Sequence, residues 1–321
     1  MMTGISDKYG RTFRTLRVSL LQHCNMACVY CVSDEEELPR ANAPSSEPGL
    51  GPGELLRLIG RLHEQLTLTN VRLTGGEPLL YPGLVPLISG IRELGVQSVK
   101  LTTNALLLGR QAVSLKNAGL EAINVSLDAV DEAIFFRMTR RHSVGRVISG
   151  IDAAIAAGLD VKLNAVIMKG VNDSELLPLL DLAASRGLRI RFLEVMAMGH
   201  LHDSAERHLL SQDEMLAIIG ERHRLEPLPR VASATANYWR TAEGQVFGII
   251  ANQSQPFCRD CDRLRLDSGG RIYGCLSSNE SIGLRMDEGE EEWNRKLLSA
   301  LLQKQPLRFK GSDLSMLKVG G

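Results

Sequence analysis

Short apolar segments alternate with longer amphipathic segments from Arg14 to about Val195. The apolar segments are rich in valine, isoleucine and leucine without strict alternation, which is typical of parallel strands covered on both faces. They are Thr15–Leu21, Val71–Thr74, Ser98–Thr103, Ala122–Leu127, Val161–Ile167 and Arg189–Val195. Helical periodicity marks the intervening segments Gly53–Leu66, Leu84–Leu94, Gly109–Ala118, Val144–Ala157 and Glu175–Arg186. Because six βα units are too few for a closed eightfold barrel, the pattern predicts an α/β fold with a partial, open (β/α)6 barrel.

The alternation stops after Gly199, and shorter β-like segments follow it. These are Gln245–Ala251, Arg263–Asp267 and Arg271–Leu276, and a helix around Glu291–Gln303 and an extended tail come after them. We therefore expect three parts: an N-terminal extension (1–13), the partial barrel (14–198) and a smaller α+β C-terminal region (199–321).

Composition narrows the class of protein. The 321 residues include 37 Lys and Arg and 37 Asp and Glu, so the formal net charge is zero, and 44% of the residues are hydrophobic. Zero net charge argues against a protein that coats nucleic acid and against one that binds membranes through a basic patch. The sequence has no apolar run of about 18 residues, and its N-terminus has no apolar signal segment, so we expect a cytoplasmic protein with no membrane partner. An anionic ligand would need a local cluster of cations.

Six cysteines form two groups of three, and they carry the most information about function. The groups are Cys24, Cys28 and Cys31, and Cys258, Cys261 and Cys275. Disulfides would require an oxidising compartment and a small loop-rich chain, so metal or cluster ligation is the better interpretation. Three thiolates leave one coordination position open, which favours catalysis and substrate binding over a closed structural site.

The first group follows the first predicted strand, at the carboxyl end where a parallel barrel places its active site. The spacing Cys24-x3-Cys28-x2-Cys31, with Tyr30 before the last cysteine, resembles the radical S-adenosylmethionine (SAM) superfamily. The resemblance implies a [4Fe-4S] cluster on these cysteines, with SAM on the fourth iron. The segment Thr74–Pro78 (TGGEP) ends the second strand and agrees with it. Carried over residue by residue, the SAM contacts are Tyr30, Gly76, Ser126 and Met196.

The second group, Cys258-x2-Cys261-x13-Cys275 with Arg263 and Arg265, is a rarer pattern. Together with the first group it resembles the GTP 3′,8-cyclases (MoaA type), which open molybdenum cofactor biosynthesis. The further matching segments are Leu16-Arg17, Thr102–Asn104, Asn124–Asp128, Val161-Lys162, Lys169–Asn172, Arg191-Phe192 and Gly320-Gly321. The resemblance implies a second [4Fe-4S] cluster whose open iron binds guanine.

Cations from separate strands are expected to hold the nucleotide. GTP carries about four negative charges, so a net-neutral protein must concentrate positive side chains around it. The resemblance implies GTP contacts from Arg17, Arg72, Thr102, Lys162, Arg191, Arg263 and Arg265. It also implies catalytic roles for Arg17, Gly320 and Gly321, because the double glycine reaches into the active site, where glycine has no side chain to clash.

The implied reaction converts GTP to (8S)-3′,8-cyclo-7,8-dihydroguanosine 5′-triphosphate. An electron enters the first cluster, SAM yields a 5′-deoxyadenosyl radical, this radical takes hydrogen from C3′ of the ribose, and C3′ then bonds to C8 of guanine. The implied partners are GTP, a reductant and cyclic pyranopterin monophosphate synthase as the next enzyme. A homodimer is compatible with the sequence, and no nucleic-acid partner is expected.

Three segments depart from the family pattern. Leu21–His23 replaces Thr-Asp-Arg, Val32-Ser33 replaces Met-Pro, and Asn70 stands where many members have a lysine. The first change removes a charge near the cluster, and the change at Asn70 removes a phosphate contact. Two alternatives stay open: a radical SAM enzyme with an auxiliary cluster that acts on another nucleotide or a peptide, and a zinc-binding structural module in which His23 supplies a fourth ligand.

Overall fold

Six parallel strands follow one another in chain order and form the centre of the sheet. They are β1 (Thr15–Ser19), β2 (Asn70–Thr74), β3 (Ser98–Thr103), β4 (Ala122–Ser126), β5 (Asp160–Ile167) and β6 (Arg189–Glu194). The structure is a computed structural model that describes residues 5–33, 49–305 and 307–320. All six predicted strands are confirmed, with ends within two residues of the expected positions.

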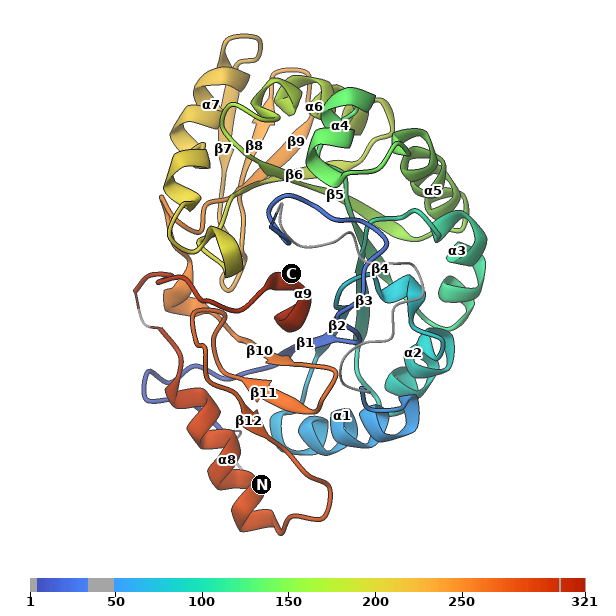
Figure 1. Ribbon diagram of the computed structural model, residues 1–321, viewed down its shortest axis with the longest axis vertical. Helices are drawn as coiled ribbons and strands as arrows, with labels where there is room; N and C mark the ends of the chain where they lie inside the picture. The colour runs from blue at the N-terminus through green and yellow to red at the C-terminus, as the bar shows by residue number, and fades with distance from the viewer. Residues whose placement is uncertain (1–4, 34–48, 306, 321) are drawn as a thin grey trace.

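Helices cover the outer face of this curved sheet (Figure 1). The five predicted ones are confirmed as α1 (Pro52–Leu66), α2 (Leu84–Glu93), α3 (Leu108–Asn117), α5 (Val144–Ala156) and α6 (Leu176–Ser185). In α1, Leu55, Leu58, Ile59 and Leu62 are buried at helical spacing, which gives the helix one apolar face toward the strands. Glu54 caps its first turn by accepting a hydrogen bond from the Gly51 amide. The short helix α4 (Glu132–Thr139) was not predicted, because eight residues give little periodicity.

The inner face of the strands is polar, which differs from the expected burial of both faces. In β5, Val161, Leu163 and Ala165 are buried, whereas Lys162 and Asn164 between them remain partly exposed. Successive strand residues point to opposite faces, so the apolar set packs under the helices and the polar set faces the interior of the barrel. The interior is therefore a cavity and not a filled core.

The C-terminal strands extend both edges of the same sheet. On one edge β9 (Val246–Ile250) pairs in parallel with β6, and on the other β10 (Arg263–Leu266) pairs in parallel with β1. The outer strands are antiparallel: β8 (Asn237–Thr241), β7 (Leu225–Leu228), β11 (Arg271–Tyr273) and β12 (Ile282–Gly283). The sheet order is β12-β11-β10-β1-β2-β3-β4-β5-β6-β9-β8-β7. The C-terminal region thus shares a sheet with the barrel, and the boundary at residue 198 stays a prediction.

The remaining helices shape the C-terminal half. The predicted α8 is confirmed at Glu290–Leu302, and α7 (Gln212–Gly220) was not predicted. The tail was expected to be extended, but it contains the short helix α9 (Met316–Val319). Figure 1 shows α9 inside the ring formed by the curved sheet. The fold thereby brings the last residues of the chain beside its first strand.

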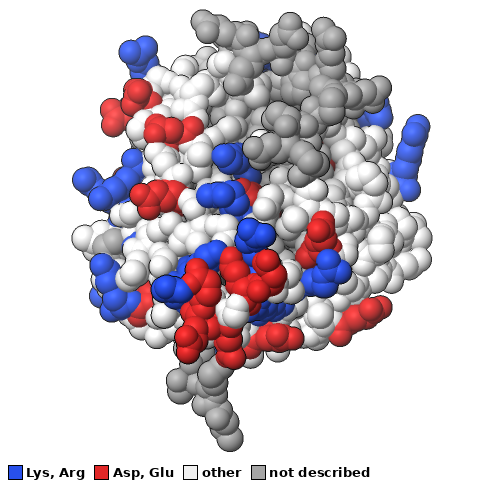
Figure 2. All heavy atoms as spheres, turned by 60° about the horizontal axis from the view of Figure 1, so that its bottom comes forward, with Lys and Arg blue, Asp and Glu red and all other residues white. Residues whose placement is uncertain are grey.

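The outer surface carries both signs of charge. On the face in Figure 2, lysine and arginine side chains are interspersed with aspartate and glutamate. Among the described residues, no helix is long and apolar enough to cross a membrane.

Candidate active site

One cavity of about 770 Å³ occupies the interior of the barrel, and both cysteine groups line it. The lining residues come from the inner faces of the central strands, from the loops at their carboxyl ends and from the C-terminal region. Two segments more than 200 residues apart in the sequence therefore line the same cavity.

The first cysteine group lies in a loop that follows β1. Burial raises the pKa of Cys24 to about 11, and Glu77 adds to this effect. Burial and the neighbouring thiols also raise the pKa of Cys28 and Cys31. Thiolates in this position therefore need a compensating positive charge, which iron in a cluster supplies.

Two N–H groups lie near the Cys24 sulfur, one on the same loop and one directly after β3. The Met26 amide donates to Cys24 Sγ at 3.4 Å, and Asn104 Nδ2 lies 3.7 Å from the same sulfur. Such bonds stabilise a ligating thiolate and tune an iron–sulfur cluster.

The TGGEP segment packs directly against the cysteine loop. The amide of Gly76 donates to the Leu21 carbonyl at 2.6 Å, and the amide of Glu77 donates to the His23 carbonyl at 2.8 Å. A Cβ on Gly76 would lie 2.0 Å from the His23 oxygen, so only glycine fits there. Burial raises the pKa of Glu77 to about 7, although it accepts hydrogen bonds from its neighbours. The two loops hold each other at the carboxyl ends of β1 and β2.

The four predicted SAM contacts all line the cavity: Tyr30, Gly76, Ser126 and Met196. Tyr30 donates its hydroxyl to Asp128 Oδ2 at 2.8 Å, and the Val166 amide donates to Asp128 Oδ1 at 2.8 Å. Asp128 thus fixes the tyrosine ring beside the cysteines. The roles of these residues stay predictions.

The second cysteine group contains one unusually acidic thiol. Burial raises the pKa of Cys258 to about 11, and the other two cysteines add to this. Burial would also raise the pKa of Cys261, but Lys304 and then Arg263 outweigh it and lower that pKa to about 6. Lys304 Nζ donates to Cys261 Sγ at 3.5 Å and to the Arg263 carbonyl. Sequence reasoning missed Lys304, because a buried lysine just after α8 carries no motif.

Cluster-free protein should show this difference in its thiol reactivity. We expect iodoacetamide to modify Cys261 with a pH midpoint of about 6, while Cys258 reacts only near its pKa of about 11, because the thiolate is the nucleophile. Lys304→Met should raise the pH midpoint for modification of Cys261. The control Lys116→Met, at an exposed position of α3, should leave that midpoint unchanged. Peptide mass mapping across a pH series measures both, and equal midpoints for the two cysteines would contradict the expectation.

The donor set of both groups fits clusters. Each group supplies three thiols to the lining of the cavity, and within each group the thiols influence one another's pKa. In a [4Fe-4S] cluster each thiolate binds a different iron atom. His23, the proposed fourth zinc ligand, is not among the residues that line the cavity.

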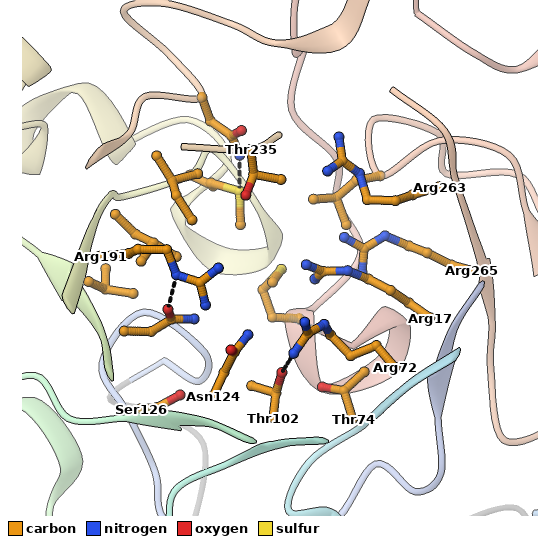
Figure 3. A pocket seen from close by; sticks show the side chains of 18 of the residues that line it. Arg17, Arg72, Thr74, Thr102, Asn124, Ser126, Arg191, Thr235, Arg263 and Arg265 are labelled. Carbon is orange, nitrogen blue, oxygen red and sulfur yellow. Dashed lines mark hydrogen bonds between the residues drawn. The ribbon is translucent and has the colours of Figure 1, made fainter. Parts of the chain in front are cut away.

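Five arginines line the cavity, and we call them the cationic wall; in Figure 3, Arg191 lies across the open space from the other four. Their guanidinium groups converge on one open space from β1, β2, β6 and β10, and they are Arg17, Arg72, Arg191, Arg263 and Arg265. Burial and the four neighbouring arginines lower the pKa of Arg17 well below its usual value. Burial and like charges also lower the pKa of Arg72 to about 9.

Two atoms of this wall lack a partner. The Nη2 atoms of Arg191 and Arg263 are buried without a hydrogen bond among the described residues. Cations that repel one another and leave buried N–H groups unpaired are unfavourable until an anion binds. The cationic wall is therefore arranged for a polyanionic ligand.

Lys162 and Gly320 differ in position: Lys162 does not line the cavity, whereas Gly320 is buried. Lys162, an expected GTP contact, does not line the cavity, and its Nζ pairs with Asp160 at 2.6 Å. Gly320 is buried inside the barrel, where Arg265 donates to its carbonyl and to that of Val319. Gly321 lies outside the described residues. The entry of the tail into the barrel agrees with expectation, and its catalytic role stays a prediction.

Sequence reasoning missed a rim of the cavity between β7 and β8. Residues 231–236 line the cavity there, and Thr235 points toward it in Figure 3. Asp260 holds this rim, because it pairs with Arg230 at 2.9 Å and accepts a bond from the Ser233 amide at 2.7 Å. No motif marks this segment; its position follows only from the pairing of β8 with β9.

Two family descriptions together cover most of the chain. The Radical SAM superfamily matches residues 18–183, and Molybdenum Cofactor Synthesis C matches residues 188–310. A protein of Corynebacterium glutamicum named GTP 3′,8-cyclase is 38% identical over 98% of this chain and 89% of its own length. The chain belongs to the GTP 3′,8-cyclase family. A GTP 3′,8-cyclase of Staphylococcus saprophyticus is also 38% identical, over 87% of this chain and 83% of its own length.

Family membership confirms the expected radical SAM fold and its cofactors, which are two [4Fe-4S] clusters and SAM. It also argues against the zinc-binding structural module.

Solved structures support the fold at low sequence identity. SuiB of Streptococcus suis bound to its precursor peptide SuiA has a TM-score of 0.64 at 15% identity, over 92% of this chain and 67% of that one. The structure of anSMEcpe with bound AdoMet has a TM-score of 0.62 at 13% identity, over 88% of this chain and 80% of that one.

Proposed function

We propose that this protein converts GTP to (8S)-3′,8-cyclo-7,8-dihydroguanosine 5′-triphosphate, the first step of molybdenum cofactor biosynthesis. The observation that carries the proposal is the lining of one cavity, which combines two cysteine groups, each with three thiols, and the cationic wall of five arginines. A radical SAM enzyme for an uncharged substrate would have no need for that wall.

The first cysteine group serves the radical chemistry. Cys24, Cys28 and Cys31 would hold a [4Fe-4S] cluster, which together with SAM supplies hydrogen-atom abstraction. Tyr30, Gly76, Ser126 and Met196 would orient SAM. The Gly76 backbone leaves room for close approach because it carries no side chain.

The second group and the cationic wall orient the substrate. Cys258, Cys261 and Cys275 would hold the second [4Fe-4S] cluster beside the guanine base. The arginines would bind the triphosphate, and the unpaired Nη2 atoms of Arg191 and Arg263 would then gain acceptors. Holding base and phosphates at separate points fixes the ribose between them, so that C3′ faces SAM and C8 faces C3′.

The finer partners follow from this reaction. We infer a cytoplasmic location, where thiols stay reduced, a reductant for the first cluster, and transfer of the product to cyclic pyranopterin monophosphate synthase. A homodimer remains compatible with the sequence.

An isotope experiment tests the proposal. Reconstituted protein is incubated anaerobically with reductant, SAM and GTP deuterated at C3′, and 5′-deoxyadenosine is analysed by mass spectrometry. We expect deuterium in 5′-deoxyadenosine. Unlabelled 5′-deoxyadenosine formed equally without GTP would leave a radical SAM enzyme for another nucleotide or a peptide. No 5′-deoxyadenosine from iron-replete protein would overturn both assignments.

A further inference from the structure

Lys100 and Asn70 form a pair on the inner face of two neighbouring strands. Lys100 is on β3 opposite Arg72 of β2, and Asn70 is two residues before Arg72 on the same face. Lys100 Nζ donates to Asn70 Oδ1 at 3.1 Å, and both residues line the cavity. Lys100 therefore places an ammonium group beside the cationic wall, whereas Asn70 itself carries no charge.

Asn70 is oriented to hold that ammonium group. Its Nδ2 donates to Thr69 Oγ1 at 3.0 Å, which turns its Oδ1 toward Lys100. A neutral amide cannot attract a phosphate as a lysine would. By accepting one N–H of Lys100, it leaves the other two for a ligand.

The surrounding carboxylates are engaged elsewhere. Glu121 accepts from the Ser98 hydroxyl, and Asp160 pairs with Lys162 at 2.6 Å. Burial lowers the pKa of Lys100, and Arg72 and then Lys162 act in the same direction, while Glu121 and Asp160 oppose them. Among the residues that the structure describes, no carboxylate forms an ion pair with Lys100, whereas Lys162 has one.

We propose that Lys100, held by Asn70, binds the outer phosphates of the nucleoside triphosphate. This inference rests on the proposed function and adds to it a contact that the family pattern does not supply. The cation absent at position 70 is provided from the neighbouring strand, and the phosphates would lie between Lys100 and Arg72. Lys100 thereby contributes to discrimination between nucleoside triphosphates and nucleosides with fewer phosphates.

Equilibrium binding to the reconstituted, anaerobic protein without SAM or reductant tests the proposal. Affinities for GTP, GDP and guanosine are measured for the wild type, Lys100→Met and the control Lys116→Met. We expect Lys100→Met to weaken GTP binding about tenfold to a hundredfold, with a smaller loss for GDP and none for guanosine. Lys116 is exposed and donates to the Gly158 carbonyl, so its variant should bind like the wild type.

A charge-swap variant checks the position of the cation. Asn70→Lys with Lys100→Asn keeps one amide and one ammonium on the same two strands, so it should recover most of the GTP affinity. Equal GTP affinity of Lys100→Met and wild type, or an equal loss for GTP and guanosine, would overturn the role of Lys100. Wild-type protein that binds no GTP at all would instead overturn the proposed function.

Discussion

Cys24→Ala is expected to abolish SAM cleavage, whereas Cys275→Ala should abolish only cyclisation. Cys24 belongs to the group beside Tyr30 and Gly76, and Cys275 belongs to the group beside Arg263 and Arg265. Loss of one thiolate from the first group should lower formation of 5′-deoxyadenosine more than about a hundredfold. Loss from the second group should leave uncoupled SAM cleavage within about tenfold of wild type, because the first group keeps all three of its thiols.

Two assays on the same preparations measure this difference. Formation of 5′-deoxyadenosine without GTP reports the first group, and formation of the cyclised nucleotide reports both groups. Iron content should fall in each variant, which confirms that a cluster site was removed. Normal SAM cleavage by Cys24→Ala, or complete loss of it in Cys275→Ala with the first cluster intact, would contradict the assignment of the two groups.

Gly320→Ala is expected to lower cyclisation about a hundredfold while SAM cleavage continues. Gly320 has a φ of 72°, in the left-handed region that favours glycine. A Cβ there would lie 2.4 Å from Thr74 Cγ2, in the strand that ends in the TGGEP segment. The tail must therefore move, and Arg265, which donates to the Gly320 carbonyl, must move with it or lose its acceptor.

Gly145→Ala is the matched control for this change. Gly145 lies in the first turn of α5, and a Cβ on it would meet no atom within 4 Å. It should therefore keep full activity. The uncoupled and coupled assays described for the cysteine variants separate the outcomes, and wild-type cyclisation by Gly320→Ala would show that the tail has no part in catalysis.

Local sequence patterns predicted the central strands and the type of chemistry of this protein. Apolar segments such as Val161–Ile167 must be buried wherever the chain folds, so periodicity located all six central strands. Thiolates three or four residues apart can converge on one ion or cluster, so the spacing around Cys24 and Cys258 indicated metal or cluster ligation, and the family resemblance specified [4Fe-4S] clusters. The arginines also followed from the sequence, but only through their place in a family pattern.

Tertiary structure decided what depends on pairing between distant strands. Lys304 reaches Cys261 because α8 packs against β11 and β12 and places this lysine, just after the helix, near the start of β10, and no local pattern encodes that contact. Lys162 of β5 carries the expected charge, yet it pairs with Asp160, while Lys100 of β3, two strands away, lines the cavity instead. The sequence alone therefore determined the elements and the type of chemistry, because these depend on local periodicity and ligand type. Which cations face the substrate depends on strand register and on competing carboxylates, and only the folded chain sets these.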